Sequence, residues 1–461
     1  MRTLLKTAGF VAVILSGGGA ALADTGSPID GRWDASLTTK DGTVIPFRLE
    51  LSGTDSTLKG TLYDGFHPYD GTTSATFKDG TLVLNIEHYL TTINAQLKDG
   101  QLLGNVTSQG RGQFQQFGFQ AVHHVEATAS AGAGAAPNVA GSWVVPLPAP
   151  SAKGERAFRF IVEQHGSEIA ASILRVDGDT GSYTGEFKDG KWVLSHFDGS
   201  RPGVITVIPN ADGTVEIDQR ANQPPAAQPV SNTSSAYSAD ENSPNGRNAA
   251  KLVGYRPDVA TAKGLPQPEN YETHTTARDA HEKFTFSFPD DGGKLVTNED
   301  PRFKGKVVLA IVTGTWCPNC HDEAQYLVQL DRKYRNKGLA IVALDFEEPD
   351  QQGNLEREHA FVKQYGVKYT YLIAGAPEEM WEKVPQLVNL NTWPATVFIG
   401  RDGTVRAVHS GFASPASGEF NDQLQKEFTT RIEALLAEKA ADARTAAGHG
   451  GDKPLEVAQA P

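Results

Sequence analysis

The sequence predicts a multidomain protein in which duplicated all-β modules precede a C-terminal α/β domain. The first observation is the length of 461 residues, because domains commonly contain about 100–200 residues. The second is that short alternating segments separated by Asp-Gly pairs fill the first half, as in antiparallel strands joined by tight turns. The third is that apolar strand-like runs alternate with helical patterns in the second half, which is typical of an α/β domain.

Charge and cysteine content exclude several classes of protein. Lys and Arg number 42 and Asp and Glu number 55, which gives a formal net charge of −13. A chain this acidic is poorly suited to bind nucleic acid or anionic membranes, so we expect no nucleic-acid partner. Two cysteines are too few for a disulfide-stapled scaffold.

The N-terminus has the three parts of a secretory signal peptide. Arg2 and Lys6 precede an apolar run at 8–15, and Ala21-Leu22-Ala23 supplies small residues for cleavage. The apolar stretch is shorter than the ~20 residues that a spanning helix needs. We therefore expect residues 1–23 to be a cleaved signal peptide and the mature chain to be periplasmic or secreted, where disulfides persist.

An internal repeat fills the first half. Phe77-Lys78-Asp79-Gly80 recurs as Phe187-Lys188-Asp189-Gly190, an offset of 110 positions (187 − 77), and Gly31-Arg32-Trp33 matches Gly141-Ser142-Trp143 at the same offset. A shared register predicts a duplicated module, each copy a small β-sandwich or open barrel. Asp-Gly pairs predict type I′ hairpin turns, and they stand at 41–42, 79–80, 99–100, 177–178, 189–190 and 212–213.

Composition then sets the predicted boundaries. They are a signal peptide at 1–23, β-module 1 at 24–125, an Ala/Gly linker at 126–140, β-module 2 at 141–220, an irregular linker at 221–268, the α/β domain at 269–440 and a disordered tail at 441–461. The modules show no catalytic pattern. The pair His123-His124 has no further ligands at a suggestive spacing, whereas structural zinc needs four, so we predict no metal site.

The second half contains alternating strands and helices. Continuous apolar runs rich in β-branched residues are typical of strands buried on both faces. Strands are predicted at 307–312, 339–344, 369–373, 395–399 and 405–408, and helices after Cys320, at 355–365, at 378–388 and at 420–436. This order predicts a mixed central sheet with helices on both faces.

Cys317 and Cys320 stand where the first of these strands gives way to a helix. A thiolate, not a thiol, attacks a disulfide, and the free N–H groups and dipole of a helix start stabilise a thiolate. Pro318 fits the first helical turn. We expect Cys317 to lie at an exposed tip and attack, and Cys320, one turn further in, to resolve the mixed disulfide.

Residues 269–440 resemble the TlpA/ResA-like family of extracytoplasmic thioredoxin-fold thiol-disulfide oxidoreductases. The resemblance rests on Trp316-Cys317-Pro318-Asn319-Cys320, on Glu323, on Trp393-Pro394-Ala395-Thr396 and on the turn Gly400-Arg401-Asp402-Gly403. It implies a thioredoxin-like domain in which Pro394 is cis and faces the sulfurs. Trp316, Pro318, Asn319 and Trp393 would support the catalytic group of Cys317, Cys320, Glu323 and Pro394.

The resemblance also implies an activity. It suggests a reductase of protein disulfides that needs no metal and no cofactor beyond the redox-active Cys317–Cys320 disulfide. Its partners would be protein thiol or disulfide substrates and a membrane or periplasmic electron donor. Thioredoxin itself has a buried Asp six residues before its first cysteine, where this chain has Ile311. Glu323 is expected to tune or deprotonate Cys320; the alternative is an ordinary acid favoured by the helix dipole.

Three other interpretations remain open. Cys317-Pro318-Asn319-Cys320-His321 also fits the attachment motif of c-type haem, with Met380 as a distal ligand, although a preceding buried strand disfavours it. A peroxiredoxin-like antioxidant would use Thr313 or Thr315 but also a proline before Cys317, which this loop lacks. Alternatively, the β-modules form a binding or scaffold protein with a vestigial redox domain. In the redox interpretation His321 is a surface residue.

Overall fold

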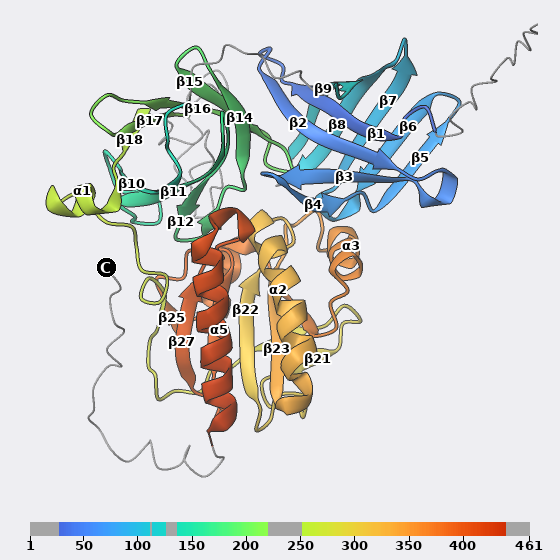
Figure 1. Cartoon of the computed structure of the whole chain (residues 1–461). Coiled ribbons are helices and arrows are strands. Elements are labelled where there is room, and N and C mark those ends of the chain that lie inside the picture. The colour runs from blue at the N-terminus through green and yellow to red at the C-terminus, as the bar shows by residue number, and fades with distance from the viewer. Residues whose placement is uncertain (1–26, 111–112, 126–135, 220–250, 439–461) are drawn as a thin grey trace, which may run out of the picture.

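The computed structural model describes residues 27–110, 113–125, 136–219 and 251–438. Two β-modules lie at one end of an α/β domain, as Figure 1 shows. The predicted signal peptide, the predicted tail at 441–461 and most of both predicted linkers fall outside the described residues.

The first module is one antiparallel sheet of nine strands in the order β4-β3-β2-β1-β9-β8-β7-β6-β5. Its two edges meet between β4 and β5, where two consecutive residues bond to opposite edges of the sheet. The Thr72 amide donates to Gly60 O of β3 at 2.9 Å, and the Thr73 amide donates to Asn85 O of β6 at 2.8 Å. The strands are β1 (Gly31–Thr38), β2 (Val44–Ser52), β3 (Lys59–Asp64), β4 (His67–Gly71), β5 (Ser74–Lys78), β6 (Thr81–Ile86), β7 (Thr91–Lys98), β8 (Gln101–Gly110) and β9 (Gln113–His123).

The second module is also antiparallel, and it extends beyond its predicted end at 220. Its strands are β10 (Gly141–Pro146), β11 (Ala157–His165), β12 (Glu168–Arg175), β13 (Gly178–Asp179), β14 (Tyr183–Lys188), β15 (Lys191–His196), β16 (Gly203–Pro209), β17 (Val215–Asp218) and β18 (Lys251–Gly254). β18 pairs with β17, and Tyr255 and Val144 exchange 2.8 Å backbone hydrogen bonds that close the sheet onto β10.

The predicted linker at 221–268 is therefore corrected at its C-terminal end. It contains β18 and the short helix α1 (Pro257–Ala262). Their apolar side chains explain the difference, since Leu252 packs in the core of the second module and Ala260 is buried against Val144. Burial of a few well-placed apolar residues outweighs the polar composition around them.

Equivalent features recur in the two modules. The Trp33 indole donates to Ile29 O at 2.9 Å, and the Trp143 indole donates to Val139 O, also at 2.9 Å. Both residues of Asp79-Gly80 and of Asp189-Gly190 have positive φ, as type I′ turns require. Asp99-Gly100 does the same, but at 41–42, 177–178 and 212–213 only the glycine has positive φ, so type I′ is wrong there. Two of these pairs lie in the longer loops at 39–43 and 210–214.

The α/β domain has the predicted mixed sheet, in the order β24-β23-β22-β26-β27. β22 (Val307–Thr313), β23 (Leu339–Phe346) and β24 (Thr370–Gly375) are parallel, and β26 (Ala395–Ile399) and β27 (Val405–Ser410) are antiparallel additions. The other elements are α2 (Pro318–Tyr334), α3 (Glu356–Tyr365), α4 (Met380–Lys383), α5 (Glu419–Ala437) and the short strands β19 (Thr276–Ala277), β20 (Ser287–Pro289), β21 (Leu295–Thr297) and β25 (Leu387–Val388).

Apolar side chains fill both faces of this sheet. The side chains of β22 alternate between the two faces of the sheet. On one face, Val307, Leu309 and Ile311 share a core with helices α2 and α5. On the opposite face, the other apolar side chains of β22 share a core with α4. The helix predicted at 378–388 is much shorter, since it is limited to a 3-10 turn at Pro377–Glu379 followed by α4. Pro385 explains this, because proline disfavours helical geometry in the residue before it, and Val384 has φ −126° and ψ 59°.

The three units share core residues. Phe197 and Val204 of the second module belong to the core of the first, and Leu174 belongs to the core between α2 and α5. Among the described residues, the helices are too short or too polar to span a bilayer.

Candidate active site

The strand-to-helix turn that carries both cysteines forms as predicted. β22 ends at Thr313, Cys317 is the N-cap of α2 with φ −95° and ψ 114°, and Pro318 occupies the first helical turn. The Cys320 amide donates to Cys317 O at 3.0 Å. Both cysteines are free thiols, and their side chains are hydrogen-bonded to each other.

Cys317 is not at an exposed tip, which corrects the sequence-based expectation. Its exposed fraction is 5% and that of Cys320 is 2%. The Cys317 thiol donates to the carbonyl oxygen of Trp393 at 3.5 Å. Trp393 also packs edge-on against Trp316, with ring centroids 5.1 Å apart. The Trp393–Pro394 peptide is cis, as the family resemblance implied.

Burial sets the protonation of Cys320. Loss of solvent raises the pKa of the Cys320 thiol well above its ordinary value, and the hydrogen bond with Cys317 adds to the increase. A hydrogen bond from Thr313 opposes it more weakly. Cys320 therefore stays protonated at neutral pH, and it must lose this proton before it can attack a disulfide.

Glu323 lies one turn beyond Cys320 and is buried, with an exposed fraction of 1%. The Thr396 hydroxyl donates to its Oε1. Burial raises the pKa of Glu323 to about 8, so the carboxyl group can gain or lose a proton near neutral pH. Thr396 is the cross-strand partner of Ile311. The hydrogen bond to this carboxylate thus comes from β26, which pairs with β22 at Ile311, the position where thioredoxin has its aspartate.

His321 is fully buried, which corrects its predicted surface position. Its Nε2 lies 2.6 Å from Thr315 O and its Nδ1 lies 3.0 Å from the Tyr365 hydroxyl. Its ring also stacks on Tyr89 of the first module, with centroids 4.3 Å apart. Both ring nitrogens are engaged, so this histidine is not placed to ligate haem iron.

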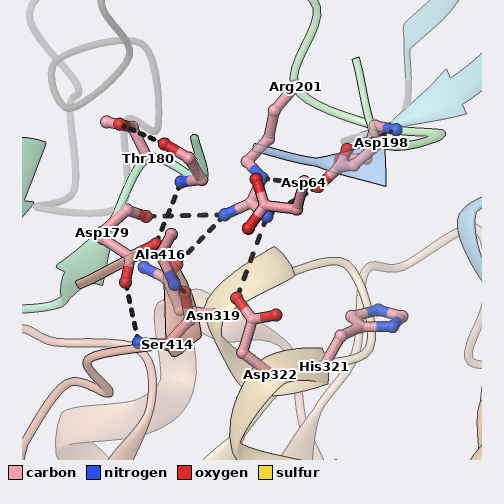
Figure 2. A network of polar contacts seen from close by, with 12 residues as sticks. Asp64, Asp179, Thr180, Asp198, Arg201, Asn319, His321, Asp322, Ser414 and Ala416 are labelled. Carbon is pink, nitrogen blue, oxygen red and sulfur yellow. Dashed lines mark hydrogen bonds and ion pairs between the residues drawn. The ribbon is translucent and has the colours of Figure 1, made fainter. Parts of the chain in front are cut away.

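The β-modules reach the active-site motif, and the sequence did not predict this. Figure 2 shows Arg201 of the second module extending to the start of α2. Its Nη1 donates to Asn319 Oδ1 at 3.3 Å, and its Nη2 lies 3.8 Å from Asp322 Oδ2. Asn319 Nδ2 donates in turn to Asp177 O at 2.9 Å. The Tyr69 hydroxyl of the first module donates to Asp322 Oδ1 at 2.6 Å.

Buried charges surround Arg201. Asp198 accepts from Arg201 Nη2 at 2.6 Å, and His196 Nε2 lies 3.4 Å from Asp198. Although burial opposes it, Arg201 and His196 hold the pKa of Asp198 below its ordinary value. Burial raises the pKa of Asp322 to about 8 despite Arg201, and burial also raises the pKa of Asp64. Arg201 is thus the cation around which these acids are arranged (Figure 2).

Two groups of possible metal ligands have other partners. His124 Nδ1 lies 2.9 Å from Asp34, and the His123 ring packs at a tilt against Trp33 with centroids 3.8 Å apart. Among the described residues, Glu272, His409 and Glu427 also converge. Glu272 is already paired with Arg431 at 2.5 Å and with His409 at 2.9 Å, and these ion pairs account for its position.

The geometry defines a thioredoxin-like dithiol domain: a strand, a buried Cys-x-x-Cys at a helix start and a cis-proline turn beside the first sulfur. Comparisons with known proteins identify it further. Residues 277–424 match the sequence model of the Redoxin family. The C-terminal domain is therefore a redoxin domain, and its relatives include thiol-disulfide oxidoreductases named ResA.

Two ResA proteins illustrate the extent of the similarity. ResA of Bacillus thuringiensis (strain Al Hakam) is 33% identical over 120 residues, which cover 26% of this chain and 62% of that protein. ResA of Halalkalibacterium halodurans is 26% identical over 154 residues, 33% of this chain and 81% of that protein. A solved secreted disulfide oxidoreductase of Mycobacterium tuberculosis, homologous to DsbE of E. coli, is 24% identical with a TM-score of 0.25, covering 32% of this chain and 96% of that one.

Proposed function

We propose that this protein is an extracytoplasmic thiol-disulfide oxidoreductase that reduces protein disulfides through Cys317 and Cys320. The observation that carries the proposal is the pair of hydrogen-bonded thiols at the start of α2, with Cys317 against the Trp393 carbonyl. Similarity of the domain to ResA proteins supports the chemistry. The signal-peptide pattern at residues 1–23 supports the location.

The reaction is two successive thiol-disulfide exchanges. The Cys317 thiolate attacks one substrate sulfur, so a mixed disulfide forms and the other substrate sulfur leaves as a thiolate. Cys320 then loses its proton and attacks Cys317 Sγ, which releases the second substrate thiol. The dithiol gives up two electrons and becomes the Cys317–Cys320 disulfide, which a membrane or periplasmic dithiol donor reduces again.

Glu323 is the proposed proton acceptor for the second step. Cys320 has a raised pKa and reacts only after losing its proton, and Glu323, one turn on, has a pKa of about 8. A base is most effective when its pKa lies near the working pH. Trp316, Pro318, Asn319, Trp393 and Pro394 are proposed to position the two sulfurs.

Single cysteine variants test this function. We expect Cys317→Ser to lose its ability to catalyse the reduction of a protein disulfide by dithiothreitol, because the attacking sulfur is gone. Cys320→Ser should instead accumulate a mixed disulfide with the substrate, because the resolving sulfur is gone. Mass spectrometry of the adduct and the rate of thiol release measure the two outcomes. A Cys317→Ser protein that keeps the wild-type rate contradicts the proposal and favours a scaffold with a vestigial redox domain.

The two β-modules are proposed to be duplicated copies of one ancestral module. The shared 110-residue offset, the matching indole hydrogen bonds of Trp33 and Trp143 and the matching Asp-Gly turns support it. Two unrelated segments would not be expected to share these features in one register, whereas two copies of one ancestral module would.

A further inference from the structure

Three of the four residues that immediately follow Pro318 contact the β-modules. Asn319 is bonded to Asp177 O and to Arg201 of the second module. His321 and Asp322 are held by the first module, through Tyr89 and Tyr69 respectively. Both modules therefore cover the first turn of α2, in which the two thiols lie.

The segment at residues 176–179, which comprises the turn after β12 and the short strand β13, fits this surface closely. Gly178 forms a parallel bridge with Phe412, just after β27. A Cβ on Gly178 would lie 2.5 Å from Phe412 O and 2.7 Å from Asn319 Nδ2. Even one methyl group has no room there, so backbone and side chains of the two domains are in direct contact beside the motif.

Asp179 fixes the same segment to the loop after β27. Its carboxylate accepts from the Ser414 amide at 2.7 Å, from the Ser414 hydroxyl at 3.0 Å and from the Ser417 hydroxyl at 2.6 Å. A carboxylate with several short donors makes strong charge-assisted hydrogen bonds. With Arg201 on one side and Asp179 on the other, the second module is attached on both sides of Asn319 (Figure 2).

We propose that the β-modules form a cap that determines substrate size: while they are seated on α2, Cys317 exchanges only with small thiols and disulfides, and a disulfide within a folded protein reaches it only after the segment at 176–179 moves away. This inference rests on the proposed function. Its physical basis is that a thiolate must meet the attacked sulfur directly, whereas Cys317 is only 5% exposed. Asn319, one of the two residues between the cysteines, is covered by Asp177 and Arg201.

Alkylation of the reduced full-length chain tests the cap without requiring catalysis. The probes are iodoacetamide and a maleimide that carries a long polyethylene glycol chain, and peptide mass spectrometry reads modification at Cys317. For each probe, the rate in the folded protein is compared with its rate in urea-unfolded protein. In the wild type we expect this comparison to show slowing that is at least about tenfold greater for the bulky probe than for iodoacetamide. A tenfold reduction corresponds to about 1.4 kcal/mol. Equal slowing of both probes overturns the proposal.

Two interface variants should open the cap. Gly178→Ala places a methyl group against Phe412 and Asn319, and Arg201→Gln removes the cation that links Asp198 to Asn319. Each should raise the bulky-probe rate about tenfold and the iodoacetamide rate less, because modification tracks the population of the open form.

Matched controls isolate the interface from general strain. The control for Gly178→Ala is Gly31→Ala, because the φ of Gly31 is +114° and that of Gly178 is +122°. A Cβ on Gly31 would meet nothing within 4 Å. Arg48→Gln breaks an ion pair inside the first module. Both controls should behave as wild type, and interface variants that match their controls overturn the proposal. If alkylation follows the expected pattern while Cys317→Ser keeps full exchange activity, the proposed function fails but the cap does not.

Discussion

At the scale of single residues, the most informative group is Glu323, because burial rather than a charge partner sets its behaviour. Burial raises its pKa to about 8, and the Thr396 hydroxyl lowers it only partly. In an unfolded chain the pKa of a glutamate is about 4.3. Between these values the unfolded chain is ionised while the folded protein keeps the proton. The stability contributed by neutral Glu323 is complete below about pH 4 and is lost as pH rises towards 8.

Glu323→Gln should therefore stabilise the α/β domain increasingly as pH rises from 5 to 8. The glutamine amide can still accept the Thr396 hydrogen bond but has no proton to lose. The expected gain approaches about 4 kcal/mol, since each pKa unit corresponds to about 1.4 kcal/mol. Urea unfolding at several pH values measures it. The exposed Glu382 on α4 provides the control Glu382→Gln, and a gain that does not vary with pH would contradict the raised pKa.

The sequence predicted the position of both cysteines at the start of a helix, but not what surrounds them. The spacing of Cys317 and Cys320 and the start of α2 are local properties, and a strand followed by Pro318 is enough to predict them. Burial of Cys317 and His321 is not local, because the groups that cover this turn come from Tyr69, Tyr89 and Arg201. Contacts across such sequence distances leave no periodic pattern in the residues near the motif.

At the scale of elements, β18 shows how composition can hide a strand. Residues 221–268 are rich in residues that disfavour packing, yet Lys251–Gly254 closes the second module between β17 and β10. Leu252 is 3% exposed and lies in that module's core. Four residues are too few for alternation alone to predict a strand.

Leu252→Ala should therefore destabilise the second module, although Leu252 lies in the segment that the sequence predicted to be a linker. Truncating a buried leucine costs about 2–5 kcal/mol through lost burial and a residual cavity. Thermal unfolding followed by near-UV circular dichroism measures the loss. Val253→Ala is the matched control, because the neighbouring side chain is only half-buried and should cost much less. Equal, small effects in both variants would mean that β18 adds little to the module.

At the scale of the whole molecule, one loop of the second module connects all three units. Phe197 packs edge-on against Phe47 in the core of the first module, with centroids 4.8 Å apart. Asp198 and Arg201 follow within the same loop, and Arg201 contacts α2. Seating of the cap over the thiols therefore depends on an apolar anchor in the first module as well as on the ion pairs at the motif.

Phe197→Ala should uncouple the first module from the rest of the protein. Phe197 is 3% exposed, and removal of a buried phenylalanine ring costs about 3–5 kcal/mol. Because this ring belongs to the second module but packs in the core of the first, we expect the lost stability to weaken the interface between the modules. We expect differential scanning calorimetry to show a separate, earlier transition for the first module, together with faster modification of Cys317 by the bulky probe. Phe114→Ala, at a ring that is 69% exposed, should leave both measurements unchanged. A single transition merely shifted to lower temperature, with Cys317 still protected, would mean that Arg201 and Asp179 hold the cap without the anchor.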